Sequence, residues 1–182
     1  EKLFGLSFVL TTGLPVYHPD MTVYEVKNAS GAHVGYWYFD PYARPGKHSG
    51  AWMNAYREQH RVLGDVTTIV SNNSNFIKGK PGEPVTVSWD DARTMFHEFG
   101  HALHGLLSNV TYPTLSGTNT TRDFVEFPSQ FNENYLQTPE VLAFLVNDKG
   151  EKIPAALLQK IERAQKFNQG FATAEAQASA IV

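Results

Sequence analysis

One segment, Ser88 to Ser108, constrains the fold more than any other part of the sequence. Ser88 is a favourable N-cap residue, and Asp91 three positions later completes a variant of the capping box. Apolar residues then recur at helical spacing, namely Met95, Phe96, Phe99, Ala102, Leu103, Leu106 and Leu107. This pattern predicts an amphipathic helix over residues 88–108 with one face against a core.

Length and composition limit what surrounds this helix. The chain has 182 residues, of which 42% are hydrophobic, and a net charge of -3. These values fit one folded domain or a piece of a larger one, and they exclude a disordered chain. The 15 basic residues are scattered, which disfavours a nucleic-acid surface. No apolar run reaches the ~18 residues of a membrane span. Because the chain has no cysteine, any metal must be held by histidines and carboxylates.

The first third of the sequence has the composition of strands. Residues 22–26 and 34–39 are rich in β-branched and aromatic side chains and are joined by turn residues, so they predict a hairpin. Residues 65–71 form a third strand candidate. The segments 40–50 and 72–84 are rich in glycine, proline and polar residues, and we expect loops there.

The rest of the chain has helical patterns. A helix is expected to begin near Asp123, although Pro128 should kink it or delay its start. Further helices are predicted over residues 139–147 and 154–182, with a break at Gly170.

We therefore expect an α+β fold that is mainly α. The prediction is a single unit over residues 1–182, with a β-rich part at 1–87 and a helical part at 88–182. Because the chain starts without methionine and ends within a helical pattern, we interpret it as a fragment of a longer protein.

His97, Glu98 and His101 form a His-Glu-x-x-His motif inside the predicted helix. Residues four apart lie one turn apart on the same helix face, so two imidazoles there can bind one ion. The intervening glutamate can act as general base on a water at the metal. Composition alone would produce this motif about 0.02 times in such a chain, so the motif predicts a metal site.

A metal site of this kind needs a third protein ligand. The carboxylates that follow the helix are Asp123, Glu126 and Glu133, and spacing alone does not choose among them.

Two longer motifs make a resemblance specific. One is the run His97-Glu98-Phe99-Gly100-His101, and the other is the run from Ser116 to Gln130, which contains Ser-Gly-Thr-Asn and Glu-Phe-Pro-Ser-Gln. Together they resemble the M3 family of zinc metallopeptidases, and most of all its peptidyl-dipeptidase branch. Residues 18–26 and 35–47 are similar to the family's hairpin region.

The resemblance implies roles for four residues. His97, His101 and Glu126 would bind one Zn²⁺ ion, and Glu98 would be the catalytic base. The implied fold is a zincin-like core with a small N-terminal sheet. The implied activity is hydrolysis of short peptides, with release of C-terminal dipeptides.

Three residues are candidates for supporting the ligands. Asp123 and Gln130 flank Glu126 by three and four positions and could hydrogen-bond it. Their alternative roles are a helix N-cap and a solvated polar residue. His104 shares the face of the two motif histidines, and we expect it to support the site or to pack in the core.

The substrate-binding candidates lie in two loops. The resemblance places His48, Ser49, Gly50 and Ala51 along the substrate cleft. Gly117 belongs either to a loop that faces substrate or to a turn that returns the chain.

Alternative functions remain open at this stage. An oligo-endopeptidase of the same family is the alternative to dipeptide release. The family's Tyr/His/Gly-rich segment for substrate recognition does not occur in the sequence, so the chain could instead be a zinc-binding fragment without activity. We expect the full-length enzyme to be a monomer in the cytoplasm, with the periplasm as the alternative.

Overall fold

A computed structural model describes residues 1–181 of the chain. The sequence predicts a single unit, whereas the structure divides into two compact units, Glu1–Thr138 and the residues from Pro139 onward. The first unit contains the sheet and the predicted metal motif. No helix within residues 1–181 is long and apolar enough to cross a membrane.

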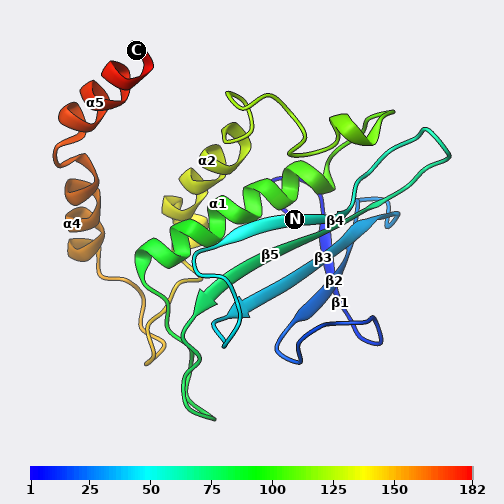
Figure 1. Cartoon of the computed structure of the whole chain (residues 1–182). Helices are drawn as coiled ribbons and strands as arrows, with labels where there is room; N and C mark the ends of the chain where they lie inside the picture. Colours follow the sequence, from blue (N-terminus) through cyan, green and yellow to red (C-terminus); the bar gives the residue numbers. More distant parts are fainter. Residues whose placement is uncertain (182) are drawn as a thin grey trace. The chain divides into compact units, whose positions relative to one another are not determined.

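A five-stranded sheet lies in the first unit (Figure 1). Its strands are β1 (Ser7–Thr11), β2 (Thr22–Lys27), β3 (His33–Tyr42), β4 (Trp52–Arg57) and β5 (Thr68–Phe76), in the spatial order β1-β2-β3-β5-β4. β2 and β3 pair as the predicted antiparallel hairpin, which confirms that part of the sequence interpretation. β3 and β5 run parallel, and β4 forms one edge of the sheet.

Several strand predictions were incomplete. β1 and β4 were not predicted as strands, and residues 72–76 belong to β5 although a loop was expected there. The reason is that β5 buries a polar run. Asn72 accepts a hydrogen bond from Trp37 Nε1 (2.8 Å) and donates one to the Glu98 carbonyl (2.6 Å). A buried polar side chain costs little free energy when it is hydrogen-bonded in this way.

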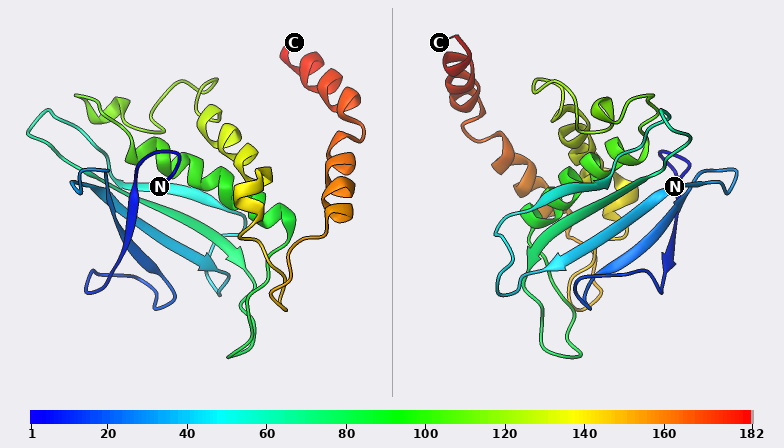
Figure 2. Two further views of the ribbon diagram at one scale, coloured as in Figure 1. Left: turned by 180° about the vertical axis from the view of Figure 1, so that it is seen from behind. Right: turned by 45° about the vertical axis from the view of Figure 1, so that its right-hand side comes forward.

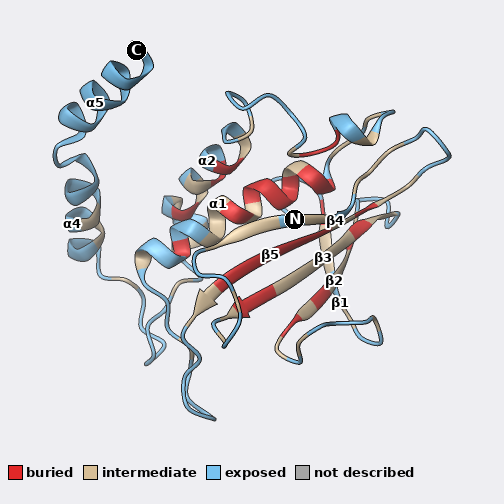
Figure 3. Ribbon diagram, in the orientation of Figure 1, coloured by how far each residue is buried: buried red, intermediate tan, exposed pale blue. Residues whose placement is uncertain are grey.

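Helix α1 (Trp89–Leu106) confirms the main helix prediction. The Ser88 side chain accepts from the Asp91 backbone N–H, and the Asp91 carboxylate accepts from the Ser88 N–H, so the capping box is complete. α1 lies across one face of the sheet, as both views in Figure 2 show. Figure 3 shows that buried residues concentrate on the central strands and on α1. The core includes Val26, Val70 and Leu103.

Helix α2 (Phe127–Glu133) runs alongside α1, preceded by a 3₁₀ turn at Pro113–Leu115 and followed by another at Asn134–Gln137. It begins four residues after the predicted start at Asp123. Gly100 allows the two helices to touch, because a Cβ atom there would lie 2.6 Å from the Cα of Ser129. Any larger residue would therefore push α2 away from α1.

The second unit contains the remaining helices, α3 (Pro139–Leu142), α4 (Ala155–Lys166) and α5 (Gln169–Ile181). The predicted helix over 139–147 is thus much shorter. The predicted break at Gly170 was misplaced, because the helices separate at Phe167 and Asn168, where Asn168 has φ +55°. Asparagine tolerates this left-handed conformation better than most residues.

A buried ion cluster closes the end of β3. The Asp40 carboxylate, 1% exposed, binds Arg44 through two hydrogen bonds of 2.7 Å and lies 3.1 Å from Lys47 Nζ. Burial alone would raise the pKa of Asp40, but the hydrogen bonds from Arg44 and Lys47 outweigh it and lower this pKa. Lys47 Nζ also donates to the backbone carbonyls of Asp40, Tyr42 and Ser74, so it ties β3 to β5.

We predict that Asp40→Asn lowers the free energy of unfolding by about 3–5 kcal/mol, because it leaves the Lys47 charge buried without its partner. The pKa of Asp40 is lowered by folding. Its stabilisation is therefore complete above the unfolded value of 3.8 and disappears as the pH falls through the folded value. Urea unfolding at pH 7 and pH 3 tests both statements. Asp65→Asn, in the exposed pair with Arg61, is the control and should change little. Equal stability of the Asp40 variant and wild type at pH 7 would contradict the prediction.

Candidate functional site

Three side chains converge beside α1. Nε2 of His97 lies 3.1 Å, and Nε2 of His101 3.2 Å, from the same oxygen, Oε2 of Glu126. One ligand atom from each residue lies within 4.8 Å of the others, so the three could hold a metal ion. The structure therefore brings together the two motif histidines and one of the three carboxylates that spacing left open.

Local structure explains this convergence. His97 and His101 are one turn apart on α1, with ring centroids 4.9 Å apart. Glu126 occupies the N-cap position of α2, and its backbone carbonyl accepts the hydrogen bond from Gln130 N–H (2.9 Å). Gly100 allows the start of α2 to pack closely against the middle of α1. This packing places the carboxylate of Glu126 beside the imidazoles of His97 and His101.

The electrostatics favour ligands in their metal-binding forms. A hydrogen bond from Ser129 Oγ (2.8 Å) is the main cause that lowers the pKa of Glu126, and His101 and His97 lower it further. Burial lowers the pKa of His101, which keeps its ring neutral. A carboxylate and a neutral imidazole are the states that bind metal.

Glu98 lies directly beside this cluster in sequence and is 8% exposed. Burial is the main cause that raises the pKa of its carboxyl. The electrostatic effect of His97 lowers this pKa, and the negative charge of Glu126 raises it further. Its surroundings are an apolar slot of about 170 Å³ that also involves Trp37, Phe39 and Phe99. A raised pKa makes the Glu98 carboxylate a stronger base than an exposed glutamate, which suits a group that accepts and returns a proton.

Glu133, an alternative third ligand by spacing, has another partner in the structure. Its Oε1 lies 2.7 Å from Nδ1 of His97, and its Oε2 accepts a 2.6 Å hydrogen bond from Arg93. Sequence reasoning missed both this contact and the role of Ser129. Seven residues are about two helical turns, so Glu126 and Glu133 lie on one face of α2.

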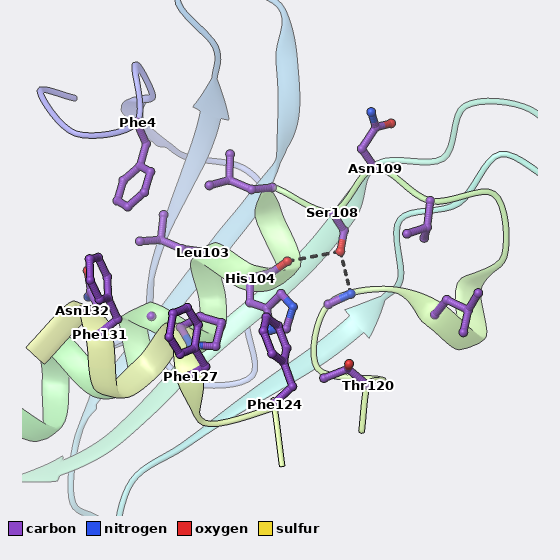
Figure 4. Close-up of a pocket in the computed structure, with 16 residues that line it drawn as sticks. Phe4, Leu103, His104, Ser108, Asn109, Thr120, Phe124, Phe127, Phe131 and Asn132 are labelled. Atoms are coloured by element: carbon purple, nitrogen blue, oxygen red, sulfur yellow. Dashed lines mark hydrogen bonds between the residues drawn. The ribbon is translucent and has the colours of Figure 1, made fainter. Parts of the chain in front are cut away.

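Among residues 1–181, none of the residues predicted to support the ligands forms a side-chain hydrogen bond with them. Asp123 and Gln130 are exposed, and Ser129 binds Glu126 instead. His104 packs edge-on against Phe124, with ring centroids 6.1 Å apart, in a separate groove of about 500 Å³ (Figure 4). Burial lowers the pKa of His104, which fits a packing role.

The predicted substrate-binding residues lie in two loops of the first unit. Residues 48–51 precede the edge strand β4, and Asn75 Nδ2 donates 2.7 Å hydrogen bonds to the carbonyls of His48 and Gly50. Gly117 packs against Gly105 at the end of α1. Its N–H donates to Oγ of Ser108, the residue labelled in Figure 4. Neither loop contacts His97, His101 or Glu126 through any hydrogen bond of the described chain.

The donor set fits a zinc ion. In a tetrahedral site with metal–ligand distances of about 2.0–2.1 Å, two ligand atoms lie about 3.3 Å apart. The Nε2-to-Oε2 separations of 3.1 and 3.2 Å are close to this value. Two imidazole nitrogens and one carboxylate oxygen are also ligand types that zinc prefers, and catalytic zinc sites have three such protein ligands. The residues thus define a candidate metal site of the His₂Glu class.

Comparison with known proteins assigns the family. The sequence model of Peptidase family M3 matches residues 1–181, and the chain belongs to this family. It is 43% identical to a dipeptidyl carboxypeptidase of Salmonella typhimurium and to that of Escherichia coli K12, over 100% of this chain and 27% of each relative. It is 33% identical to oligopeptidase A of Escherichia coli K12, over 92% of this chain and 25% of that relative. The chain thus spans about a quarter of the length of these relatives.

Proposed function

We propose that the protein is a zinc-dependent peptidase that hydrolyses short peptides and releases C-terminal dipeptides. The observation that carries this proposal is the convergence of His97, His101 and Glu126, with the buried Glu98 directly after His97 on the same helix. Family membership supports it independently, because the relatives are named peptidases. The proposed core is zincin-like, with the metal motif on α1 beside the sheet.

In the proposed mechanism, His97, His101 and Glu126 would hold one Zn²⁺, which would polarise the peptide carbonyl and lower the pKa of water so that it loses a proton near neutral pH. Glu98 takes a proton from the attacking water. As the C–N bond breaks, Glu98 gives that proton to the leaving amine. Burial of Glu98 supports this double role, because it raises the pKa of the carboxyl. The difference in pKa between Glu98 and the water or amine with which it exchanges the proton is then smaller.

The mode of cleavage follows the more similar relatives. The two dipeptidyl carboxypeptidases share 43% identity with the chain, against 33% for oligopeptidase A, so we favour dipeptide release over internal cleavage. The oligo-endopeptidase is the second candidate because oligopeptidase A also aligns with 92% of the chain. A monomeric state and a cytoplasmic location stay predictions. The roles of residues 48–51 and of Gly117 in substrate binding also stay predictions.

Product analysis of the intact natural protein tests the proposal. We expect a series of unmodified peptides to lose C-terminal dipeptides one after another, and we expect a chelator to stop the reaction. Cleavage that starts at internal bonds of the same peptides would favour the endopeptidase. No chelator-sensitive cleavage of any peptide would contradict both and would favour a zinc-binding protein without activity.

A further inference from the structure

Two consecutive residues of α2 hold two consecutive residues of α1 at the metal site. Asn132 Nδ2 donates a 2.6 Å hydrogen bond to the carbonyl of Phe96, and Glu133 Oε1 contacts His97 Nδ1 at 2.7 Å. Asn132 is 6% exposed and the Glu133 side chain 15% exposed. The first contact fixes the backbone of α1 just before the ligand, and the second fixes the ligand's ring.

The contact with Glu133 favours one tautomer of His97 when an ion is bound at Nε2. Both ring nitrogens face a carboxylate, Nδ1 that of Glu133 and Nε2 that of Glu126. An ionised carboxylate can only accept hydrogen bonds, so once an ion occupies the lone pair of Nε2, Nδ1 of the neutral ring is the donor to Glu133. In this tautomer the lone pair of Nε2 points to the place of the ion, between Nε2 and the Glu126 oxygen 3.1 Å away. A neighbouring carboxylate also makes the imidazole a stronger metal donor.

The two motif histidines differ in this respect. Nδ1 of His101 is buried and has no hydrogen-bond partner within residues 1–181, whereas Nδ1 of His97 has Glu133. Within the described chain, only His97 therefore receives this kind of support.

A simpler role for Glu133 would be an ion pair between helices. Its second oxygen, Oε2, accepts a 2.6 Å hydrogen bond from Arg93 Nε, which links α2 to α1. The Arg93 side chain is 56% exposed, so this pair contributes little to stability. The contact with His97 is the more buried of the two, because the His97 side chain is 24% exposed.

We propose that Glu133 is a positioning residue of the metal centre. It holds the ring of His97 in the orientation and tautomer that present Nε2 to the ion, and it thereby sets the affinity for zinc. The inference rests on the proposed function, because it takes His97, His101 and Glu126 as the zinc ligands.

Zinc affinity, measured by competition with a chromogenic chelator, tests this role in the intact natural protein. We expect Glu133→Ala to raise the zinc dissociation constant about 10–100-fold. Glu133→Gln should raise it less, because the amide oxygen still accepts from Nδ1 of His97. The matched control is Arg93→Ala, which removes the ion pair alone and should stay within about fivefold of wild type. Thermal unfolding of the metal-free proteins shows whether each variant is folded.

The outcomes separate the inference from the function on which it rests. A folded Glu133→Ala variant within fivefold of wild type would overturn the inference alone, as would an equal loss in Arg93→Ala. If Glu133→Ala does not fold, Glu133→Gln decides, and an unchanged dissociation constant in that variant overturns the inference. Failure of the wild-type protein to bind zinc would overturn the proposed function together with the inference.

Discussion

Replacing Glu98 with glutamine is expected to lower kcat/KM for peptide hydrolysis by about 10²–10⁴-fold while zinc stays bound. Glutamine keeps the size of the side chain and its fit to the apolar slot, but it cannot take a proton from water. Because Glu98 is not one of the three converging ligands, metal content should remain at one equivalent. Steady-state kinetics and metal analysis on the same sample measure the two quantities.

The control for Glu98→Gln is Glu162→Gln, a matched change at an exposed position of α4. It should leave both kcat/KM and zinc content unchanged. An active Glu98→Gln variant would remove Glu98 from the role of catalytic base. Loss of zinc in that variant would instead indicate that Glu98 takes part in binding the metal.

The second large effect is expected at the third ligand. Glu126→Ala should weaken zinc binding by more than about 100-fold, which exceeds the range for residues that only support a ligand. Activity should fall with the metal content, and added zinc should restore it in part. Chelator competition and kinetics at increasing zinc concentration provide the measurement.

Two comparison variants sharpen the test at Glu126. Ser129→Ala removes the hydrogen bond to Glu126 Oε2 but keeps the ligand, so its loss of affinity should be smaller. Glu133→Ala should also lose less than Glu126→Ala. The reverse order of the two glutamate variants would make Glu133 the metal ligand and would contradict the assignment.

The parts of the site that depend on local spacing were predictable from the sequence. His97, Glu98 and His101 lie within five residues of one capped helix, so helix geometry alone places the two histidines on one face. Glu126 is different, because the sequence offered three carboxylates and only the packing of α2 at Gly100 selects one. The resemblance to a family, rather than spacing, pointed to Glu126.

Long-range contacts explain what sequence reasoning missed. Asn72 and its polar neighbours read as a loop, but hydrogen bonds to Trp37 and to the carbonyl of Glu98 allow them to form a buried central strand. Ser129 and Glu133 were not recognised as partners of the ligands, because their contacts depend on how α2 docks on α1. These residues are far apart in the sequence, and helical or strand periodicity does not predict contacts between them.

The most direct test of the account is anomalous diffraction at the zinc absorption edge from crystals of the intact natural protein. We expect one zinc peak, about 2.0–2.2 Å from Nε2 of His97, Nε2 of His101 and a carboxylate oxygen of Glu126. Glu133 should lie outside the coordination sphere and contact Nδ1 of His97. A zinc ion held by other residues, or no zinc peak at this site, would contradict the account.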